Sequence, residues 1–463
     1  MNLHPSDPSP LRRGACPRLA APMPTGDGLL ARLACTGITI GLDAMAALGA
    51  AARRHGNGII EVTARGNIQV RGLSADSAPP FAAAAAALGI DTGDGLAILV
   101  DPLAGLADAH TVDARGLADA VRERLANASF TAALGPKVSI VLDGGCALHL
   151  DALRADIRLR ADGARWQIAV GGDAAPAPPI GSVAAADAPE AVMRLADLLA
   201  RRGPQARVRD LVSAHGPDPF RAAVADLIVE PAPIAARPAS EPIGMHLLRH
   251  ERFARGIALA FGHTHADTLD ALIEAARRAG ASGLRTAPPR ALVIIGLTIE
   301  ACRTLAGDAE RLGFITRPDD PRRSVIACAG APVCAAAEMA SRSLAPLISA
   351  AAAPMLDGSL TVHLSGCHKG CAHPGSSALT IVGRNGGCDL VIDGSARDLP
   401  ANPLPNPPPH AGEDMGGGET LPAGFARLAA AVARVRHGEE SSADTLSRLG
   451  AKHVAALLGG SHG

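Results

Sequence analysis

The alternation of apolar and polar positions predicts the same set of elements twice along the chain. In the first set, residues 29–40 predict a strand region, and residues 43–54 carry Ala, Leu and Met at helical spacing. Residues 59–70 alternate apolar and polar side chains, as a half-buried strand pair or bend does, and residues 78–88 predict a second helix. The second set repeats the order strand, helix, strand, helix over residues 256–261, 268–279, 283–296 and 300–312.

A shift of the sequence by 224 residues places the two sets on each other without a gap. Leu48-Gly-Ala-Ala-Ala-Arg-Arg54 then falls on Leu272-Ile-Glu-Ala-Ala-Arg-Arg278. Alanine-rich helices align by chance, but this offset holds through a helix, a strand and a second helix. We therefore expect a true internal duplication.

A fainter similarity follows each copy. Val138–Cys146 resembles Leu360–Cys367, and residues 157–172 resemble residues 379–394, each with two β-rich runs around a polar turn. The sequence therefore predicts an internally duplicated α+β fold, with two ferredoxin-like half-domains and two larger α+β domains related by a pseudo-two-fold axis.

The expected domain boundaries follow from this duplication. They are 22–105 and 241–320 for the half-domains, 106–200 and 321–400 for the larger domains, 201–240 for a bridging segment, 401–420 for a low-complexity linker and 421–463 for C-terminal helices. Within the linker, Asn402–Gly418 is rich in Pro and Gly, and we expect it to be disordered. The C-terminal helices are predicted at residues 421–436 and 442–458.

Composition narrows the class of protein. Lys plus Arg number 44 and Asp plus Glu 45, so no overall field attracts nucleic acid or an anionic membrane. Aromatic residues make up 2% of the 463 residues and Tyr is absent, which argues against a base-stacking surface. The sequence contains no run of 18 apolar residues and no signal-peptide pattern, so we expect a soluble cytoplasmic protein.

Four of the nine cysteines carry the strongest chemical signal. They form Cys328-x5-Cys334 and Cys367-x3-Cys371, each in a short turn rich in Gly, Ala or Pro. Two such turns supply the ligands of a cubane iron–sulfur cluster or of a structural zinc. The wide x5 spacing favours a [4Fe-4S] cluster, with zinc and unliganded or disulfide-bonded cysteines as alternatives. The other five form no spaced pair, which argues against a secreted disulfide framework; they are Cys16, Cys35, Cys146, Cys302 and Cys388.

The duplicated halves, the cysteine pattern and Thr63-Ala-Arg-Gly-Asn-Ile-Gln-Val-Arg71 together resemble the sulfite/nitrite reductase superfamily, over roughly residues 22–400. In that family the four cysteines hold a [4Fe-4S] cluster, and a T-x-R-x-x-x-Q strand lines the site of the anionic tetrapyrrole sirohaem. The resemblance implies a cluster held by Cys328, Cys334, Cys367 and Cys371. It implies a tetrapyrrole site that includes Arg65, Asn67, Gln69, Arg71 and Lys137.

Within the superfamily, Gly14–Arg18, Met23–Leu33 and Val208–Val212 are similar to the precorrin-3B synthases, the oxygen-using ring-contraction enzymes of aerobic cobalamin synthesis. This resemblance implies mono-oxygenation of precorrin-3A by O2, at the meso carbon C20, with a γ-lactone closing from the ring A acetate. No nicotinamide or flavodoxin-like module is visible, so an external electron donor is expected. The alternatives are a sirohaem-dependent sulfite or nitrite reductase and a non-catalytic electron carrier.

Several polar residues are candidates for the chemistry itself. His368 and Lys369 lie between two cluster cysteines, where their simplest effect is electrostatic and a catalytic role is the alternative. A mononuclear iron that binds oxygen would take two His and a carboxylate. His263, His265 and Asp267 offer such a set, with a surface loop as the alternative, and His363 and His373 are comparable candidates. Cys35, Cys146 and Cys302 lie in apolar stretches and are expected to be small buried side chains.

Overall fold

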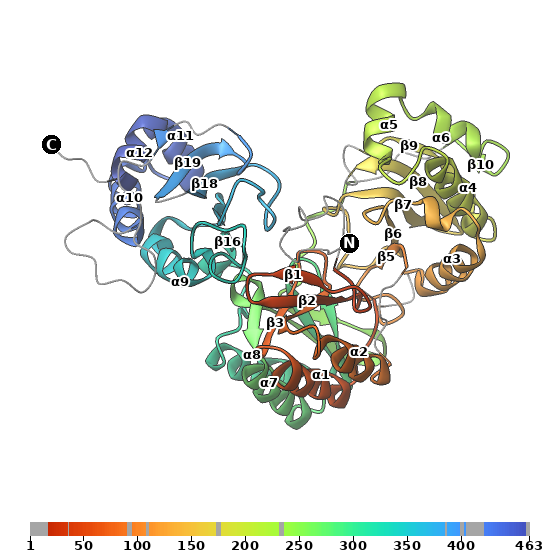
Figure 1. The fold of residues 1–463 in the computed structure, drawn as a ribbon, viewed down its shortest axis with the longest axis horizontal. Helices are drawn as coiled ribbons and strands as arrows, with labels where there is room; N and C mark the ends of the chain where they lie inside the picture. The colour runs from red at the N-terminus through yellow and green to blue at the C-terminus, as the bar shows by residue number, and fades with distance from the viewer. Residues whose placement is uncertain are drawn as a thin grey trace, which may run out of the picture.

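The protein is described here by a computed structural model. It covers residues 17–35, 37–89, 95–107, 111–172, 177–230, 236–384, 387–398, 402–403 and 421–459. These residues form an α+β fold with four β-sheets, in which a central unit carries a larger domain on either side (Figure 1). No helix among them is long and apolar enough to span a bilayer.

The first half of the central unit follows the predicted order. Its elements are β1 (Met23–Thr25), β2 (Gly28–Leu33), α1 (Leu42–His55), β3 (Ile59–Val62), β4 (Ile68–Leu73) and α2 (Ala78–Ala87). The pattern over residues 59–70 is confirmed as an antiparallel strand pair, β3 and β4. The strand expected over 29–40 ends at Leu33, and the chain then leaves the sheet before α1.

The second half repeats these elements. They are β11 (Gly244–Leu247), β12 (Phe253–Ala258), β13 (His263–His265), α7 (Ala266–Arg278), β14 (Gly283–Ala287), β15 (Ala291–Leu297) and α8 (Ile299–Arg311). Its sheet has the order β11-β12-β15-β14, while β13 joins the first half's sheet, which runs β1-β2-β4-β3-β13.

The two halves exchange backbone pairs in a reciprocal way. Thr264 pairs with Ile60, and Ile40 pairs with Leu284. Ile40 and Thr264 are 224 positions apart, and so are Ile60 and Leu284, so each contact is the other's symmetry mate. Helices α1 and α7 pack together, and apolar side chains of both halves form a single core (Figure 1). This reciprocity is consistent with the predicted duplication and pseudo-two-fold axis.

The two larger domains also share a plan. The first lateral domain contains β5 (Ala97–Val100), α3 (Arg115–Asn127), β6 (Ser139–Asp143), β7 (Ala155–Asp162), β8 (Arg165–Gly172), β9 (Pro179–Ala184), α4 (Ala188–Ala200), α5 (Val208–His215), α6 (Asp218–Ala223) and β10 (Ile228–Val229). The second contains β16 (Val325–Ala327), α9 (Ser341–Ala352), β17 (Val362–Ser365), β18 (Ser377–Arg384), β19 (Gly387–Gly394), β20 (Asn402–Pro403), α10 (Leu421–Val435), α11 (Ser442–Leu449) and α12 (Ala451–Gly459). Each sheet starts with three parallel strands and continues with an antiparallel hairpin.

Two predicted boundaries differ from the structure, and a third lies mostly outside the described residues. Much of the expected bridge at 201–240 belongs to the first lateral domain, because β10 pairs with β9 and Phe220 lies in that domain's core. The helix predicted at 442–458 is two helices, because Gly450 adopts φ 78° and ends α11. Of the segment 402–418, residues 402–403 form β20, and the rest lies outside the described residues.

Candidate active site

The four cysteines of the predicted cluster come together at one edge of the second lateral domain. Cys328 follows β16 and Cys367 closely follows β17, and these parallel strands end at the same edge of their sheet. Burial raises the pKa of the Cys367 thiol, and the nearby Cys334 and Cys328 sulfurs add to this. The pKa of Cys371 is raised by burial and by the other three sulfurs. The two turns therefore present their thiols to one another.

The surrounding backbone suits thiolates that carry a cluster. The Gly366 N–H donates to Cys328 Sγ at 3.1 Å, and the Lys369 backbone N–H donates to the Cys367 sulfur. Around zinc, Zn–S bonds of about 2.3 Å would place the sulfurs about 3.8 Å apart. No three metal-ligating atoms of this cysteine set lie within 4.8 Å of one another in the described chain. The cysteine set therefore lacks the compact spacing that a single zinc ion requires.

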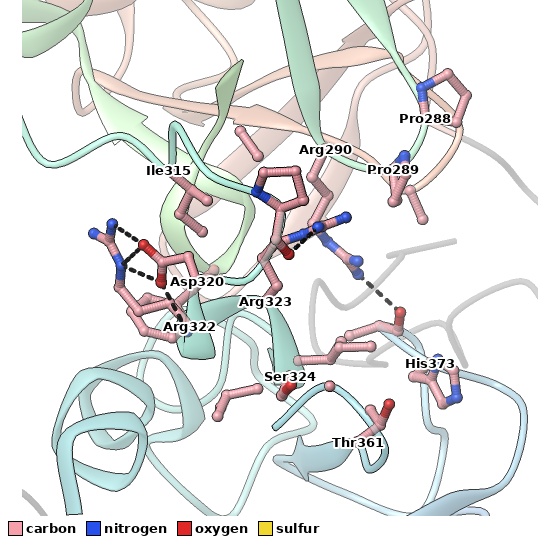
Figure 2. A pocket seen from close by; sticks show the side chains of 18 of the residues that line it. Pro288, Pro289, Arg290, Ile315, Asp320, Arg322, Arg323, Ser324, Thr361 and His373 are labelled. Carbon is pink, nitrogen blue, oxygen red and sulfur yellow. Dashed lines mark hydrogen bonds and ion pairs between the residues drawn. The ribbon is translucent and has the colours of Figure 1, made fainter. Parts of the chain in front are cut away.

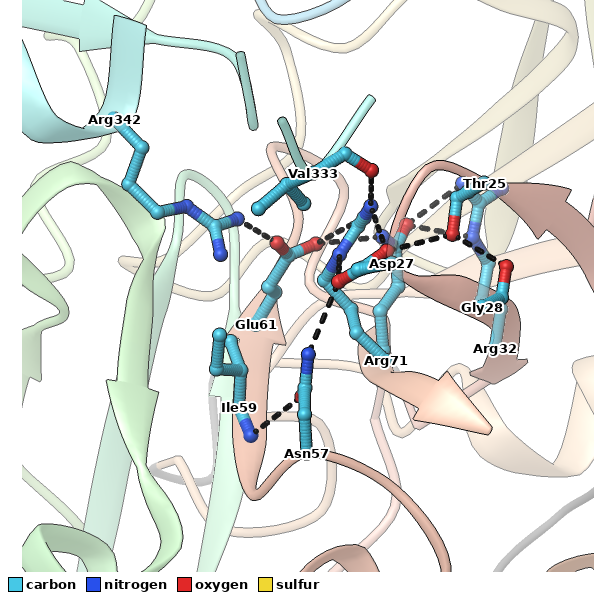
Figure 3. Close-up of polar contacts among 11 residues, drawn as sticks. Thr25, Asp27, Gly28, Arg32, Asn57, Ile59, Glu61, Arg71, Val333 and Arg342 are labelled. Atoms are coloured by element: carbon cyan, nitrogen blue, oxygen red, sulfur yellow. Dashed lines mark hydrogen bonds and ion pairs between the residues drawn. The ribbon is translucent and has the colours of Figure 1, made fainter. Parts of the chain in front are cut away.

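The Arg71 side chain connects the central unit to the Cys328–Cys334 turn by a hydrogen bond (Figure 3). Its side chain is buried and donates to both oxygens of Asp27, at 3.1 and 3.0 Å. Arg71 also donates to the Val333 carbonyl at 3.2 Å, beside Cys334. The protein itself thus binds the donors of Arg71, and in this structure the residue supports the cysteine turn.

The other three residues of the strand motif divide into two groups. Gln69 is buried, accepts from Arg32 at 2.8 Å and donates to Glu61 at 2.9 Å, so it belongs to the Arg71 network. Arg65 and Asn67 precede β4, in the turn after β3. Arg65 and Asn67 therefore do not share a strand face with Gln69 and Arg71, because β4 begins only at Ile68. Arg65 donates to the Arg154 carbonyl of the first lateral domain at 2.6 Å.

A cavity of about 600 Å³ lies where the central unit meets both lateral domains (Figure 2). Ala327 and Ala372, the chain neighbours of Cys328 and Cys371, line it, so the cavity adjoins the cysteine site. Its wall includes Ala64 from the β3–β4 turn, His149 from the first lateral domain and Arg290 from the β14–β15 turn. Sequence reasoning missed Arg290, although the 224-residue offset aligns it with Gly66, next to Arg65.

Three further predicted residues are absent from the cavity wall, as Arg65 and Asn67 also are. Lys137 is exposed and precedes β6, whereas the cavity is lined by residues that follow β6. The structure therefore separates Lys137 from the site. His368 and Lys369 are exposed between Cys367 and Cys371, and neither lines the cavity. The Lys369 carbonyl accepts from Arg397 at 3.2 Å, and this geometry favours an electrostatic role over a catalytic one.

The structure does not assemble the predicted sets of iron ligands. Asp267 pairs with Arg53 at 3.1 Å, and burial lowers the pKa of His263 to about 4. The His363 and His373 rings meet edge to face with centroids 5.7 Å apart, and burial lowers the pKa of His363 to about 4. Neither set is a group of three ligand atoms within 4.8 Å in the described residues.

One other group does meet that distance: Asp143, His149 and Asp151. Arg237 already binds it, with hydrogen bonds to both carboxylates, among them one to Asp151 at 2.6 Å. Asp143 is fully buried, so this guanidinium supplies the charge that a cation would otherwise provide. The group is an ion-pair cluster built around Arg237.

The first lateral domain has a backbone arrangement like that of the cysteine site but lacks the cysteine ligands. Asp101 directly follows β5, as Cys328 directly follows β16. The Gly144 N–H donates to Asp101 Oδ2 at 3.1 Å, as the Gly366 N–H donates to Cys328 Sγ at the same distance. Cys146 is buried as predicted, and it also shares a hydrogen bond with Asp101. A carboxyl group therefore stands where the second half has its first cysteine.

Asp101 is expected to make stability depend on pH. Burial raises the pKa of Asp101 to about 6, so this group favours the folded state most below pH 4 and loses that contribution as pH rises through 6. In Asp101→Asn the amide replaces the protonated carboxyl. We expect Asn to stabilise the protein at pH 7.5 by at most about 3 kcal/mol, from about 1.4 kcal/mol per pKa unit, with little change at pH 4.5. Urea unfolding at both pH values tests this, and an equal difference at both would contradict it.

Comparison with known proteins first defines the class. Residues 21–88 match the nitrite/sulfite reductase ferredoxin-like half domain. The structure of the Mycobacterium tuberculosis NirA protein superposes with a TM-score of 0.72 at 20% identity, over 92% of this chain and 84% of that one. Sulfite reductase [ferredoxin] 1 of Mycolicibacterium paratuberculosis is 27% identical over 181 residues, 36% of this chain and 33% of its own. The fold is thus of the nitrite/sulfite reductase type, as the motifs predicted.

A second similarity extends along nearly the whole chain. A precorrin-3B synthase from a Sinorhizobium species is 39% identical over 452 residues, which cover 97% of this chain and 95% of that protein. The chain belongs to the precorrin-3B synthase family. The predicted branch of the superfamily is therefore confirmed.

Proposed function

We propose that the protein is an O2-dependent oxidoreductase of cobalamin biosynthesis that converts precorrin-3A into precorrin-3B. The similarity to a precorrin-3B synthase over 97% of the chain carries this proposal. It is supported by a cavity that adjoins the four converging cysteines and that draws its wall from the central unit and both lateral domains.

Cys328, Cys334, Cys367 and Cys371 would hold a [4Fe-4S] cluster, which when bound supplies one-electron transfer. The N–H groups of Gly366 and Lys369 donate to the Cys328 and Cys367 sulfurs, and these hydrogen bonds would raise the reduction potential of a bound cluster. Arg71 fixes the turn that contains Cys334 through the Val333 carbonyl. These contacts would hold the four cysteine ligands in place while a bound cluster gains or loses an electron.

The reaction requires an external reductant. One atom of O2 enters the substrate at C20 and the γ-lactone closes from the ring A acetate, while the other atom leaves as water with two electrons and two protons. The described residues offer one compact set of ligands for a mononuclear iron, and Arg237 already fills it. We therefore assign no step to a second iron.

A tetrapyrrole fringed with acetates and propionates needs cationic groups around its rim. We expect Arg65 and Asn67, in the turn that contains Ala64 of the cavity wall, to meet one of these carboxylates. In this proposal, Gln69 and Arg71 act indirectly, because their polar atoms bind other protein groups.

Anaerobic purification with iron and sulfide analysis, an absorbance spectrum and acid extraction of pigment tests the function. We expect about four irons with matching sulfide, no extractable sirohaem and oxygen-dependent consumption of added precorrin-3A. Bound sirohaem together with sulfite or nitrite reduction would contradict the proposal and favour the reductase alternative. The partial similarity to a sulfite reductase is the observation that favours this alternative.

Arg65→Gln should weaken substrate binding. A hydrogen bond to a charged partner contributes about 1.5–3 kcal/mol, so we expect the Kd for precorrin-3A to rise roughly 10- to 150-fold. Lys137→Gln is the matched control, because Lys137 is exposed and lies outside the cavity wall. Anaerobic absorbance titration measures both variants. Equal loss in the two would show that general surface charge, and not this turn, governs binding.

A further inference from the structure

The two hairpin turns of the central unit meet at the cavity. The β3–β4 turn contains Arg65 and Gly66, and the β14–β15 turn, displaced by 224 residues, contains Arg290. The Arg290 N–H donates to the Thr63 carbonyl at 3.2 Å. A Cβ on Gly66 would lie 3.3 Å from Pro288 Cδ, so the turns are in close contact. Each turn thus carries one arginine close to the contact between the two turns.

The two arginines reach towards opposite domains. Arg65 Nη2 donates to the Arg154 carbonyl of the first lateral domain at 2.6 Å. Arg290 Nη2 donates to the Ala372 carbonyl of the second lateral domain at 2.9 Å, a contact drawn in Figure 2. Ala372 follows Cys371, so Arg290 touches the cysteine site and the cavity together.

Arg290 differs from the other arginines of the cavity wall in its charge balance. Arg322 pairs with Asp320 at 2.7 Å, and Arg323 pairs with Glu241 at 2.8 Å. Arg290 has no carboxylate within salt-bridge distance among the described residues. The charge of Glu61 acts on it from farther away, but burial outweighs this and lowers the pKa of Arg290. A guanidinium withdrawn from water without a direct ion pair favours an anionic ligand.

The backbone at Arg290 is also strained. Its φ is 56°, in the left-handed region that residues with a side chain rarely adopt. A Cβ on Gly262 would lie 2.7 Å from Arg290 Cδ, so a glycine there leaves room for the arginine stem. Strain of this kind persists where the surrounding structure fixes a functional side chain. The fold therefore holds Arg290 in one place against a local cost.

We propose that Arg290 is a substrate-binding residue: it holds an acetate or propionate carboxylate of the tetrapyrrole in the cavity, as the second-half counterpart of Arg65. This inference rests on the proposed function and adds a residue to its binding site. Arg65 and Arg290, from the duplicated β3–β4 and β14–β15 turns, would then bind two carboxylates of one pseudo-symmetric macrocycle next to the cysteines.

Anaerobic titration of the cluster-loaded enzyme with precorrin-3A tests this. We expect Arg290→Gln to raise the Kd at least 10-fold and to weaken its dependence on salt, because one ion pair is lost. Arg290→Lys keeps the charge and should recover part of the affinity. Arg323→Gln is the matched control: it lines the same cavity but already has a carboxylate partner, so we expect less than a threefold change.

Iron content and the thermal midpoint are measured on each variant, and Arg290→Lys serves if Arg290→Gln does not fold. Wild-type affinity and salt dependence in a folded Arg290→Gln would overturn the inference and leave the proposed function intact. Failure of the wild-type enzyme to bind precorrin-3A would overturn the proposed function, and the inference with it.

Discussion

Replacement of Cys367 by serine is expected to remove the iron and to abolish turnover. Cys367 lies between β17 and the turn that ends at Cys371, and its sulfur interacts with those of Cys328, Cys334 and Cys371. Loss of one thiolate from a set of four leaves an iron without its protein ligand. We expect purified Cys367→Ser to contain far less than about four irons per chain, without the broad brown absorbance, and precorrin-3A consumption to fall to background.

Cys388→Ala is the matched control for this experiment. Cys388 is buried in the same lateral domain but is not one of the four converging cysteines. The variant should keep its iron, its sulfide and most of its activity. Full iron and sulfide in Cys367→Ser would show that the ligand set has been assigned incorrectly, and equal loss in both variants would point to unfolding of the domain.

Much of the site could be read from the sequence because its signals are local. The cysteine spacing predicted two turns, and the turns meet because β16 and β17 are parallel neighbours that end at one edge. The 224-residue offset predicted the symmetry that the Ile40–Leu284 and Thr264–Ile60 pairs display. The same offset aligns Arg290 with Gly66, beside Arg65, and so predicts a second arginine in the duplicated turn.

The remaining features depend on contacts between distant segments. Thr63–Arg71 resembles a strand that lines a tetrapyrrole site, but Asp27, 44 residues before Arg71, binds that guanidinium. No sequence motif includes Asp101. Its correspondence to Cys328 is seen only when the residues that follow β5 and β16 are compared. The bridge at 201–240 was misplaced because a two-residue strand, β10, has too little pattern to predict.

Arg71→Met should destabilise the protein and loosen the cluster. Burial by itself would raise the pKa of Asp27, but the hydrogen bond and charge of Arg71 lower it overall, and Glu61 lies 3.7 Å from the same guanidinium. Removal of one partner of a buried ion pair costs about 3–5 kcal/mol. The loss should be full at pH 7 and should shrink in acid, where Asp27 becomes protonated.

Urea unfolding and the rate at which a chelator removes iron measure the two effects. Arg53→Met is the control, because Arg53 pairs with Asp267 and Asp270 near the surface, where such pairs contribute about 0–1 kcal/mol. Faster iron loss should occur only in Arg71→Met, since only Arg71 also holds the Val333 carbonyl next to Cys334. If both variants lose iron at the wild-type rate, then the cysteine turn keeps its geometry without Arg71. The role of Arg71 in this fold would then be limited to its ion pairs with Asp27 and Glu61.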